Sequence, residues 1–121
     1  MWHVTQSAKT YLNRTLKLPA SGFEQDWEIE LSDSSRIAEF IGLFSQTDLP
    51  REYSEALAAL ILASFEDASW EMSFSEELWE KFATIVSLNP KRFQDVLLLW
   101  TARNEGDGFA ISGRVNQLLI K

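Results

Sequence analysis

The sequence contains no cysteine, one histidine and only three prolines in 121 residues. Without cysteine the chain has no disulfide framework, no thiolate metal site and no cysteine nucleophile, and a reducing compartment fits this composition best. The single histidine, His3, stands beside the N-terminus, so catalytic triads and multi-histidine metal sites have no support. We therefore expect no catalytic activity, no cofactor and no bound metal.

Long apolar runs are also missing. The longest apolar stretch, Ala56–Ala63, is far shorter than the ~20 residues that a membrane-spanning helix needs. The first residues lack the basic patch and the extended apolar segment of a secretion signal. We expect a cytoplasmic protein that does not associate with membranes.

Large apolar side chains are nevertheless plentiful. Apolar residues make up 45% of the sequence, including eight Phe, five Trp and two Tyr. A chain of this length can bury about two thirds of its unfolded surface around one core. We expect residues 1–121 to form a single domain.

The charge of the chain is segregated along its length. The net charge is −7, but residues 21–80 hold fifteen acids and only Arg36 and Arg51 as bases, which makes this block −13. Residues 1–20 and 81–121 each carry +3. Such a block repels nucleic acid and anionic lipid and attracts a basic partner. The alternative is an acidic surface that serves only solubility.

Apolar spacing predicts helices along most of the chain after residue 33. The first predicted helix runs from residue 33 or 34 to residue 45, with a cap at Asp33. The second runs from about residue 50 to residue 66 or 67. Because it is apolar on nearly all sides from Ala56 to Ala63, we expect it to be central and buried on several faces.

Three further helices follow. One begins after Ser73 or Ser75, and the spacing from Ser73 to Glu76 matches a capping box. The next begins at Pro90 and runs to about residue 104, with Leu88 expected to pack on a residue of its first turn, Phe93, as a hydrophobic staple. After a turn at residues 105–108, the last helix opens at residue 109 or 112.

The N-terminal third carries two competing patterns. Residues 5–16 favour a helix, whereas Trp27, Ile29 and Leu31 alternate with Glu28 and Glu30 as in a strand. A short β-hairpin attached to the helices and an extended arm lying on them both fit this region. The fold class is therefore mainly α, a compact multi-helix domain of about five helices with a possible N-terminal hairpin or arm.

Acids and tryptophans gather between residues 66 and 80. Trp70 stands in a stretch that we expect to be an acidic loop, and Trp79 is offset from the apolar stripe Leu78, Phe82 and Ile85. Tryptophan is enriched both in cores and at binding hot spots, so each is either packed or an exposed anchor. The candidate partner-binding residues are Glu66, Asp67, Trp70, Glu71, Glu76, Glu77, Trp79 and Glu80.

Two bases, Lys91 and Arg92, stand in the first turn of the helix that begins at Pro90. There they oppose the helix dipole and would meet either a phosphate or an acidic neighbour. Two charges do not make a nucleic-acid interface. We expect them to pair with acids on the preceding helix.

Three segments carry a resemblance to a known family. Residues 26–33, 36–41 and 56–65 read DWEIELSD, RIAEFI and ALAALILASF. Over residues 24–67 this pattern resembles the small immunity proteins that bacteria encode beside polymorphic toxins, including those of contact-dependent growth inhibition. The resemblance implies a cytosolic protein that binds one cognate toxin domain tightly, usually a nuclease, and blocks its active site or substrate groove.

The charge pattern leads independently to a similar hypothesis. A nuclease presents a basic cleft to its polyanionic substrate, and an acidic domain can occupy that cleft in place of phosphates. The sequence therefore predicts an immunity protein that neutralises a basic toxin partner through its acidic surface. The alternative is a non-catalytic helical adaptor or structural subunit that self-associates, although nothing in the sequence indicates a homo-oligomer.

Overall fold

A computed structural model describes residues 2–46, 48–101 and 109–120 of the chain. Helices account for all of its regular structure, so the mainly α fold class is confirmed, and the described residues contain no strand. The chain forms seven α-helices and one 3₁₀ turn there, rather than about five helices with a hairpin. They are α1 (Gln6–Thr15), α2 (Trp27–Glu30), η1 (Ser34–Arg36), α3 (Ile37–Phe44), α4 (Arg51–Trp70), α5 (Glu76–Leu88), α6 (Pro90–Leu98) and α7 (Ser112–Ile120).

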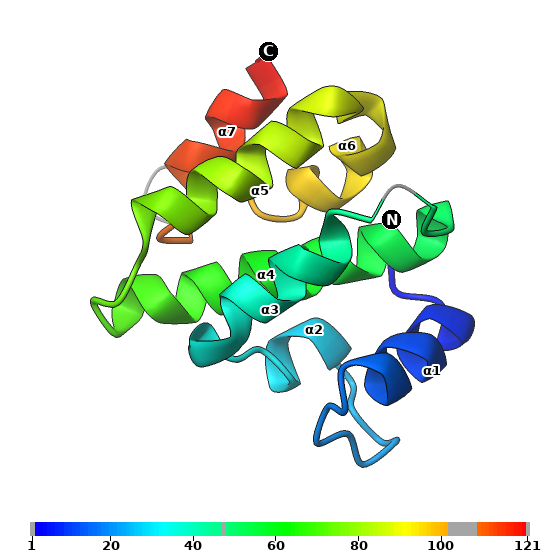
Figure 1. The fold of residues 1–121 in the computed structure, drawn as a ribbon. Coiled ribbons are helices and arrows are strands. Elements are labelled where there is room, and N and C mark those ends of the chain that lie inside the picture. Colours follow the sequence, from blue (N-terminus) through cyan, green and yellow to red (C-terminus); the bar gives the residue numbers. More distant parts are fainter. Residues whose placement is uncertain (1, 47, 102–108, 121) are drawn as a thin grey trace.

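The longest helix, α4, runs through the middle of the molecule (Figure 1). It contacts α1, α2, η1, α3 and α6, so that neighbours cover it on several sides as the sequence predicted. All residues from Ser54 to Phe65 are buried. Alanines within that stretch present little bulk, which lets the flanking helices approach its backbone closely.

The N-terminal helix is confirmed almost to the residue. The interval 5–16 becomes α1, and the Thr5 hydroxyl caps it by accepting a hydrogen bond from the Ala8 amide at 3.1 Å. Ala8 and Leu12, one helical turn apart, are buried against α4. After the helix Lys17 adopts a positive φ of 53°, and the chain reverses direction toward α2.

The predicted strand at residues 27–31 is wrong, because this segment forms the single helical turn α2. Trp27 and Leu31 are only 1% and 5% exposed, whereas Ile29 between them is 52% exposed. Residues four apart share one helix face, so a helix buries the first and last and leaves the middle residue outside. The Trp27 indole donates to the Asn13 side chain of α1 at 2.9 Å, which fixes the turn in place.

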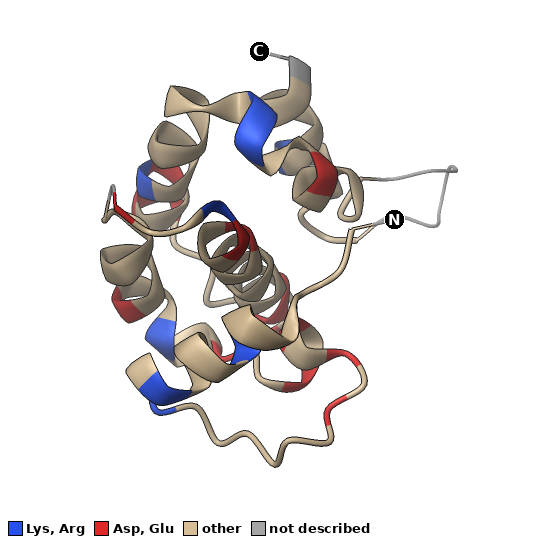
Figure 2. Ribbon diagram, turned by 90° about the vertical axis from the view of Figure 1, so that its right-hand side faces the viewer, with Lys and Arg blue, Asp and Glu red and all other residues tan. Residues whose placement is uncertain are grey.

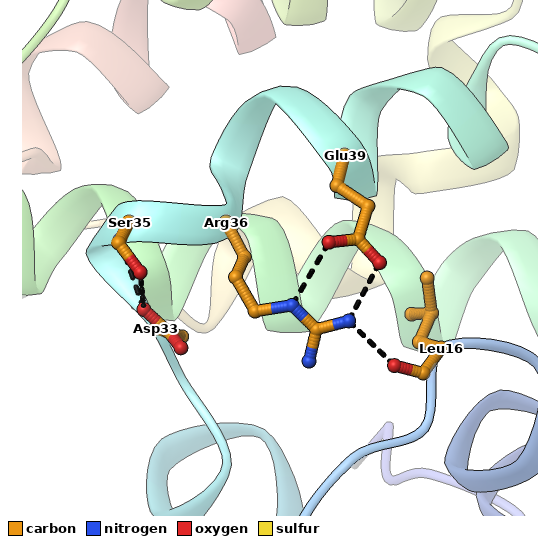
Figure 3. Close-up of polar contacts among 5 residues, drawn as sticks. All are labelled: Leu16, Asp33, Ser35, Arg36 and Glu39. Atoms are coloured by element: carbon orange, nitrogen blue, oxygen red, sulfur yellow. Dashed lines mark hydrogen bonds and ion pairs between the residues drawn. The ribbon is translucent and has the colours of Figure 1, made fainter.

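The first predicted helix after residue 33 is divided into η1 and α3. Asp33 caps it as expected, accepting from the Ser35 amide at 2.9 Å. Arg36 donates through Nε and Nη2 to the Glu39 carboxylate at 3.0 and 2.6 Å and also to the Leu16 carbonyl (Figure 3). The Arg36 guanidinium lowers the pKa of Glu39. This network joins the start of α3 to the end of α1.

Helix α5 begins after Ser75, one of the two expected positions, but two local contacts predicted in the C-terminal half are wrong. Ser75 rather than Ser73 caps α5, accepting from the Leu78 amide at 3.2 Å. Leu88 is 80% exposed and does not form the predicted staple with Phe93. Phe93 turns instead toward α3, where its ring lies 5.2 Å from that of Phe44.

The helix boundaries around α6 are partly as predicted. Asn89 separates α5 from α6, and Pro90 occupies the first helical position. The helix ends at Leu98 rather than near residue 104, and the predicted turn at residues 105–108 lies outside the described residues. The last helix, α7, opens at Ser112, one of the two expected positions.

Candidate functional site

The eight candidate partner-binding residues lie where α4 ends and α5 begins (Figure 1). The first four are within the last two turns of α4 or directly after it, because α4 continues to Trp70 instead of ending at residue 66 or 67. The predicted acidic loop is therefore helical. The other four belong to the first turns of α5. We call this region the α4–α5 corner.

Trp79 is not an exposed anchor, since only 7% of its surface is accessible. Its ring packs edge-on against Phe65 at 5.0 Å and lies 5.5 Å from Phe82 and 6.0 Å from Phe74. The face of α5 that points inward carries Trp79, Phe82 and Val86, so the helix is rotated relative to the predicted stripe. Tryptophan at this position belongs to the core.

Trp70 has the opposite environment. It is 75% exposed, and its indole Nε1 donates to the Glu66 carboxylate at 2.6 Å. Met72, two residues further on, is 93% exposed and adopts a positive φ of 57° where the chain leaves α4. The α4–α5 corner thus presents one tryptophan, held in orientation by a carboxylate, beside one methionine. Met72 is not among the residues predicted from the sequence, because no periodicity distinguishes an exposed residue after a helix end.

Glu66 links the end of α4 to the segment before α7. Besides the Trp70 indole, its carboxylate accepts from the backbone amides of Ala110 and Ile111 at 2.9 and 3.1 Å. These amides stand at the entrance to α7, where N–H groups have no partner inside the helix. Glu66 therefore contributes to the fold through contacts 44 and 45 residues away in the sequence.

Asp67 and Glu71 bind the segment between α2 and α3. Asp67 accepts a hydrogen bond from the Ser32 hydroxyl, and Glu71 accepts one from the Ser34 hydroxyl at 2.7 Å. Ser64, one turn earlier in α4, accepts from the Asp33 amide at 3.0 Å. Two residues of α4 and the residue that follows it thus hold the segment that joins α2 to α3.

Glu76 pairs with Arg114 of α7. Both guanidinium nitrogens Nη1 and Nη2 donate to its carboxylate, the first at 2.7 Å. The same guanidinium lies over the ring of Phe74, with 4.2 Å to the ring centroid. The hydrogen bonds from Arg114 lower the pKa of Glu76 below its ordinary value of 4.5.

The lowered pKa predicts a pH dependence of the free energy of unfolding. The ionised Glu76 is favoured in the folded chain, so its contribution is present above about pH 4.5 and is lost as the pH falls through the lower folded-state pKa. We expect Glu76→Gln to be less stable than the natural protein at neutral pH, and the difference to shrink as the pH falls below that value. Thermal unfolding across the acidic range measures it.

Glu77→Gln is the matched control for this measurement, because the Glu77 side chain is 82% exposed and only a surface contact of 3.9 Å joins it to Lys81. A Glu76→Gln curve that runs parallel to the natural one at every pH contradicts the prediction.

The remaining acids, Glu77 and Glu80, are exposed on α5. Of the six candidate acids, these are the two whose carboxylates accept no hydrogen bond from another part of the described chain. Acidic charge is not confined to the corner: Figure 2 shows acids also on α2 and the loop before it, and bases on α1. What distinguishes the corner is the exposed Trp70 among its acids.

The described residues include no group of three or more His, Cys, Asp or Glu side chains that could hold a metal ion. Among the helices in the described ranges, none combines the length and the apolar character needed to cross a membrane.

Comparison of the chain with known protein families, with characterised proteins and with solved structures gives no match in any of the three.

Proposed function

We propose that this protein is a cytoplasmic immunity protein that binds a cognate bacterial toxin, a nuclease domain, through the α4–α5 corner and covers its active site or substrate groove. The observation that carries the proposal is Trp70, 75% exposed and oriented by Glu66, on an acidic corner. Exposed tryptophans supply a large apolar contact area together with one hydrogen-bond donor, which is why they dominate many protein interfaces.

Charge supports a basic partner. Glu77 and Glu80 are exposed on the α5 side of the corner, and the block at residues 21–80 carries −13. A nuclease groove holds cations for phosphates, so carboxylates can replace the phosphates there. Because exposed charges are screened over about 8 Å at physiological salt, we expect association to slow as the salt concentration rises.

The first experiment is affinity capture of the tagged protein from its native cells, together with the product of the neighbouring upstream reading frame, at low and at moderate salt. A basic toxin domain that is captured and loses its activity on binding supports the proposal. Capture of the chain by itself, with a salt-insensitive homodimer in sedimentation, overturns it in favour of the self-associating adaptor.

Substitutions at the α4–α5 corner should weaken the complex with the toxin. Trp70→Ala should weaken toxin binding about tenfold to a hundredfold, because a central tryptophan anchor is worth about 2 kcal/mol or more.

The double charge reversal Glu77→Lys with Glu80→Lys should also weaken toxin binding, mainly through a slower association rate. Titration calorimetry and stopped-flow association measure the two effects.

Matched controls separate these effects from changes in fold and net charge. Phe23→Ala removes another exposed aromatic ring, 90% accessible, from the loop between α1 and α2. Glu28→Lys with Asp95→Lys changes the net charge by the same amount on α2 and α6. If the controls weaken binding as much as the corner substitutions, the corner is not the contact surface.

A further inference from the structure

A basic pocket lies where α4 and α6 begin, at the opposite end of α4 from the corner. Its lining residues are Leu49, Arg51, Asn89, Lys91 and Arg92. The pocket has a volume of about 490 Å³, within the range of small-molecule sites. Three cationic side chains around one hollow are unusual in a chain of net charge −7.

Both helices that open at this pocket lack a side-chain cap. Pro50 precedes α4 and has no side chain that can accept, and the Asn89 side chain makes no capping hydrogen bond to α6. The first amides of a helix have no partner inside it and carry partial positive charge. The beginnings of α4 and α6 therefore add to the positive potential that their basic side chains create.

Arg92 lies in α6 and lines the pocket. Its Nη2 donates to the Leu49 carbonyl at 2.8 Å, in the backbone before α4. The predicted pairing of Arg92 with an acid of the preceding helix is therefore wrong. Its Nε is buried, and within the described part of the chain it is the one buried side-chain polar atom without a hydrogen-bond partner. Arg92 as a whole is only partly buried and its Nη2 is already bonded, so it contributes positive charge to the pocket.

Two acids moderate this potential. The Glu55 carboxylate lies 3.3 Å from Arg51 Nε and its side chain is only 10% exposed. Asp95, one turn after Lys91 on α6, is close enough for its charge to raise the pKa of Glu55. Burial raises the pKa of Glu55, so the folded chain disfavours its negative charge. Lys91 has no ion-pair partner within the described residues, which leaves a net positive pocket.

We propose that this pocket binds the phosphate group of a small molecule, either free inorganic phosphate or a phosphate monoester. Two guanidinium groups, one ammonium and two uncapped helix starts suit a compact anion with several acceptor oxygens. The site is separate from the α4–α5 corner and does not depend on the proposed toxin.

Phosphate binding can be measured on the full chain by nuclear magnetic resonance and by titration calorimetry. The probes are inorganic phosphate and glycerol 3-phosphate, each compared with chloride at the same ionic strength. We expect amide shifts to concentrate at the starts of α4 and α6. Tighter binding of glycerol 3-phosphate identifies the monoester as the ligand class, and equal or tighter binding of inorganic phosphate identifies the free anion.

Lys91→Glu should weaken phosphate binding at least fivefold. An acidic residue in the first turn of a helix is favourable to the helix dipole, so this variant should be no less stable than the natural protein. Lys81→Glu is the matched control, because it makes the same charge change at an exposed position on α5. Glu55→Gln should have the opposite effect and tighten binding, since it releases Arg51 from its ion pair.

Two results overturn the site. The first is phosphate-dependent shifts that chloride reproduces at the same ionic strength. The second is equal weakening by Lys91→Glu and Lys81→Glu, which would show a general response to net charge rather than binding at this pocket.

Discussion

Replacing Trp79 with alanine should lower the free energy of unfolding by about 3–5 kcal/mol, the cost usual for removing a large buried aromatic side chain. Trp79 is 7% exposed and contacts three phenylalanines, of which Phe65 is completely buried in α4. Its removal leaves a cavity between α4 and α5 that the surrounding rings only partly fill. Urea unfolding at neutral pH measures the loss.

Trp70→Ala is the matched comparison, because it deletes the same side chain from a position 75% exposed nine residues earlier. Little apolar surface is buried there, and the one hydrogen bond that the variant loses is exposed to solvent, which reduces its contribution to about 1 kcal/mol or less. Trp79→Ala should therefore mainly lower the stability of the fold, whereas Trp70→Ala should mainly weaken partner binding. Equal losses of stability would show that Trp79 is not a core residue.

Glu66→Ala should cost about 2–3 kcal/mol, because hydrogen bonds to charged groups are individually worth about 1.5–3 kcal/mol and this carboxylate accepts from two backbone amides. The loss should be local to the contact between α4 and α7. Hydrogen exchange at Ala110 and Ile111 should accelerate more than exchange in the middle of α4. The stability of Glu66→Gln should lie between that of the natural protein and that of Glu66→Ala, since the amide oxygen of glutamine can still accept hydrogen bonds but carries no charge.

Glu80→Ala is the control for Glu66. The Glu80 side chain is exposed, and its carboxylate accepts no hydrogen bond within the described residues, since the Thr84 hydroxyl bonds to its backbone carbonyl instead. We expect a change within about 0.5 kcal/mol. If Glu66→Ala is equally silent, then the contacts to Ala110 and Ile111 do not stabilise the fold in solution.

These two results bear on how acids at the α4–α5 corner are used. Glu66, Asp67, Glu71 and Glu76 each accept hydrogen bonds from distant parts of the chain. Their negative charge still contributes to the field that a basic partner meets, yet substituting them changes stability as well as binding. Tests of partner binding are therefore cleanest at Trp70, Glu77 and Glu80, which the fold does not require.

Local sequence was sufficient for the helices whose apolar residues recur over several turns. The stretch Ala56–Ala63 is apolar on all sides, and α4 is accordingly central and buried. Asn89 and Pro90 mark a boundary through backbone chemistry alone, and the chain divides there into α5 and α6. The exposure of Trp70 was among the alternatives that the acidic surroundings suggested.

Short segments were less predictable, because few residues cannot define a period. Trp27, Ile29 and Leu31 alternate, but the first and last are also one helical turn apart. A strand needs a hydrogen-bonding neighbour, whereas a helical turn satisfies its own backbone and here also lets Trp27 reach Asn13 on α1. The Trp27–Asn13 hydrogen bond, which joins residues fourteen positions apart, favours the helical turn over a strand.

The sequence by itself determined a helical chain with a central α4, an acidic middle block and no cysteine chemistry, because composition and helical periodicity are local properties. Only the tertiary structure decided that Trp79 points inward, that Glu66 joins α4 to the start of α7, and that bases from α4 and α6 share one pocket. Each of these outcomes depends on how helices rotate and pack against one another. Packing joins residues that are 40 or more positions apart in places, as at Glu66, and such pairs leave no signal in one sequence.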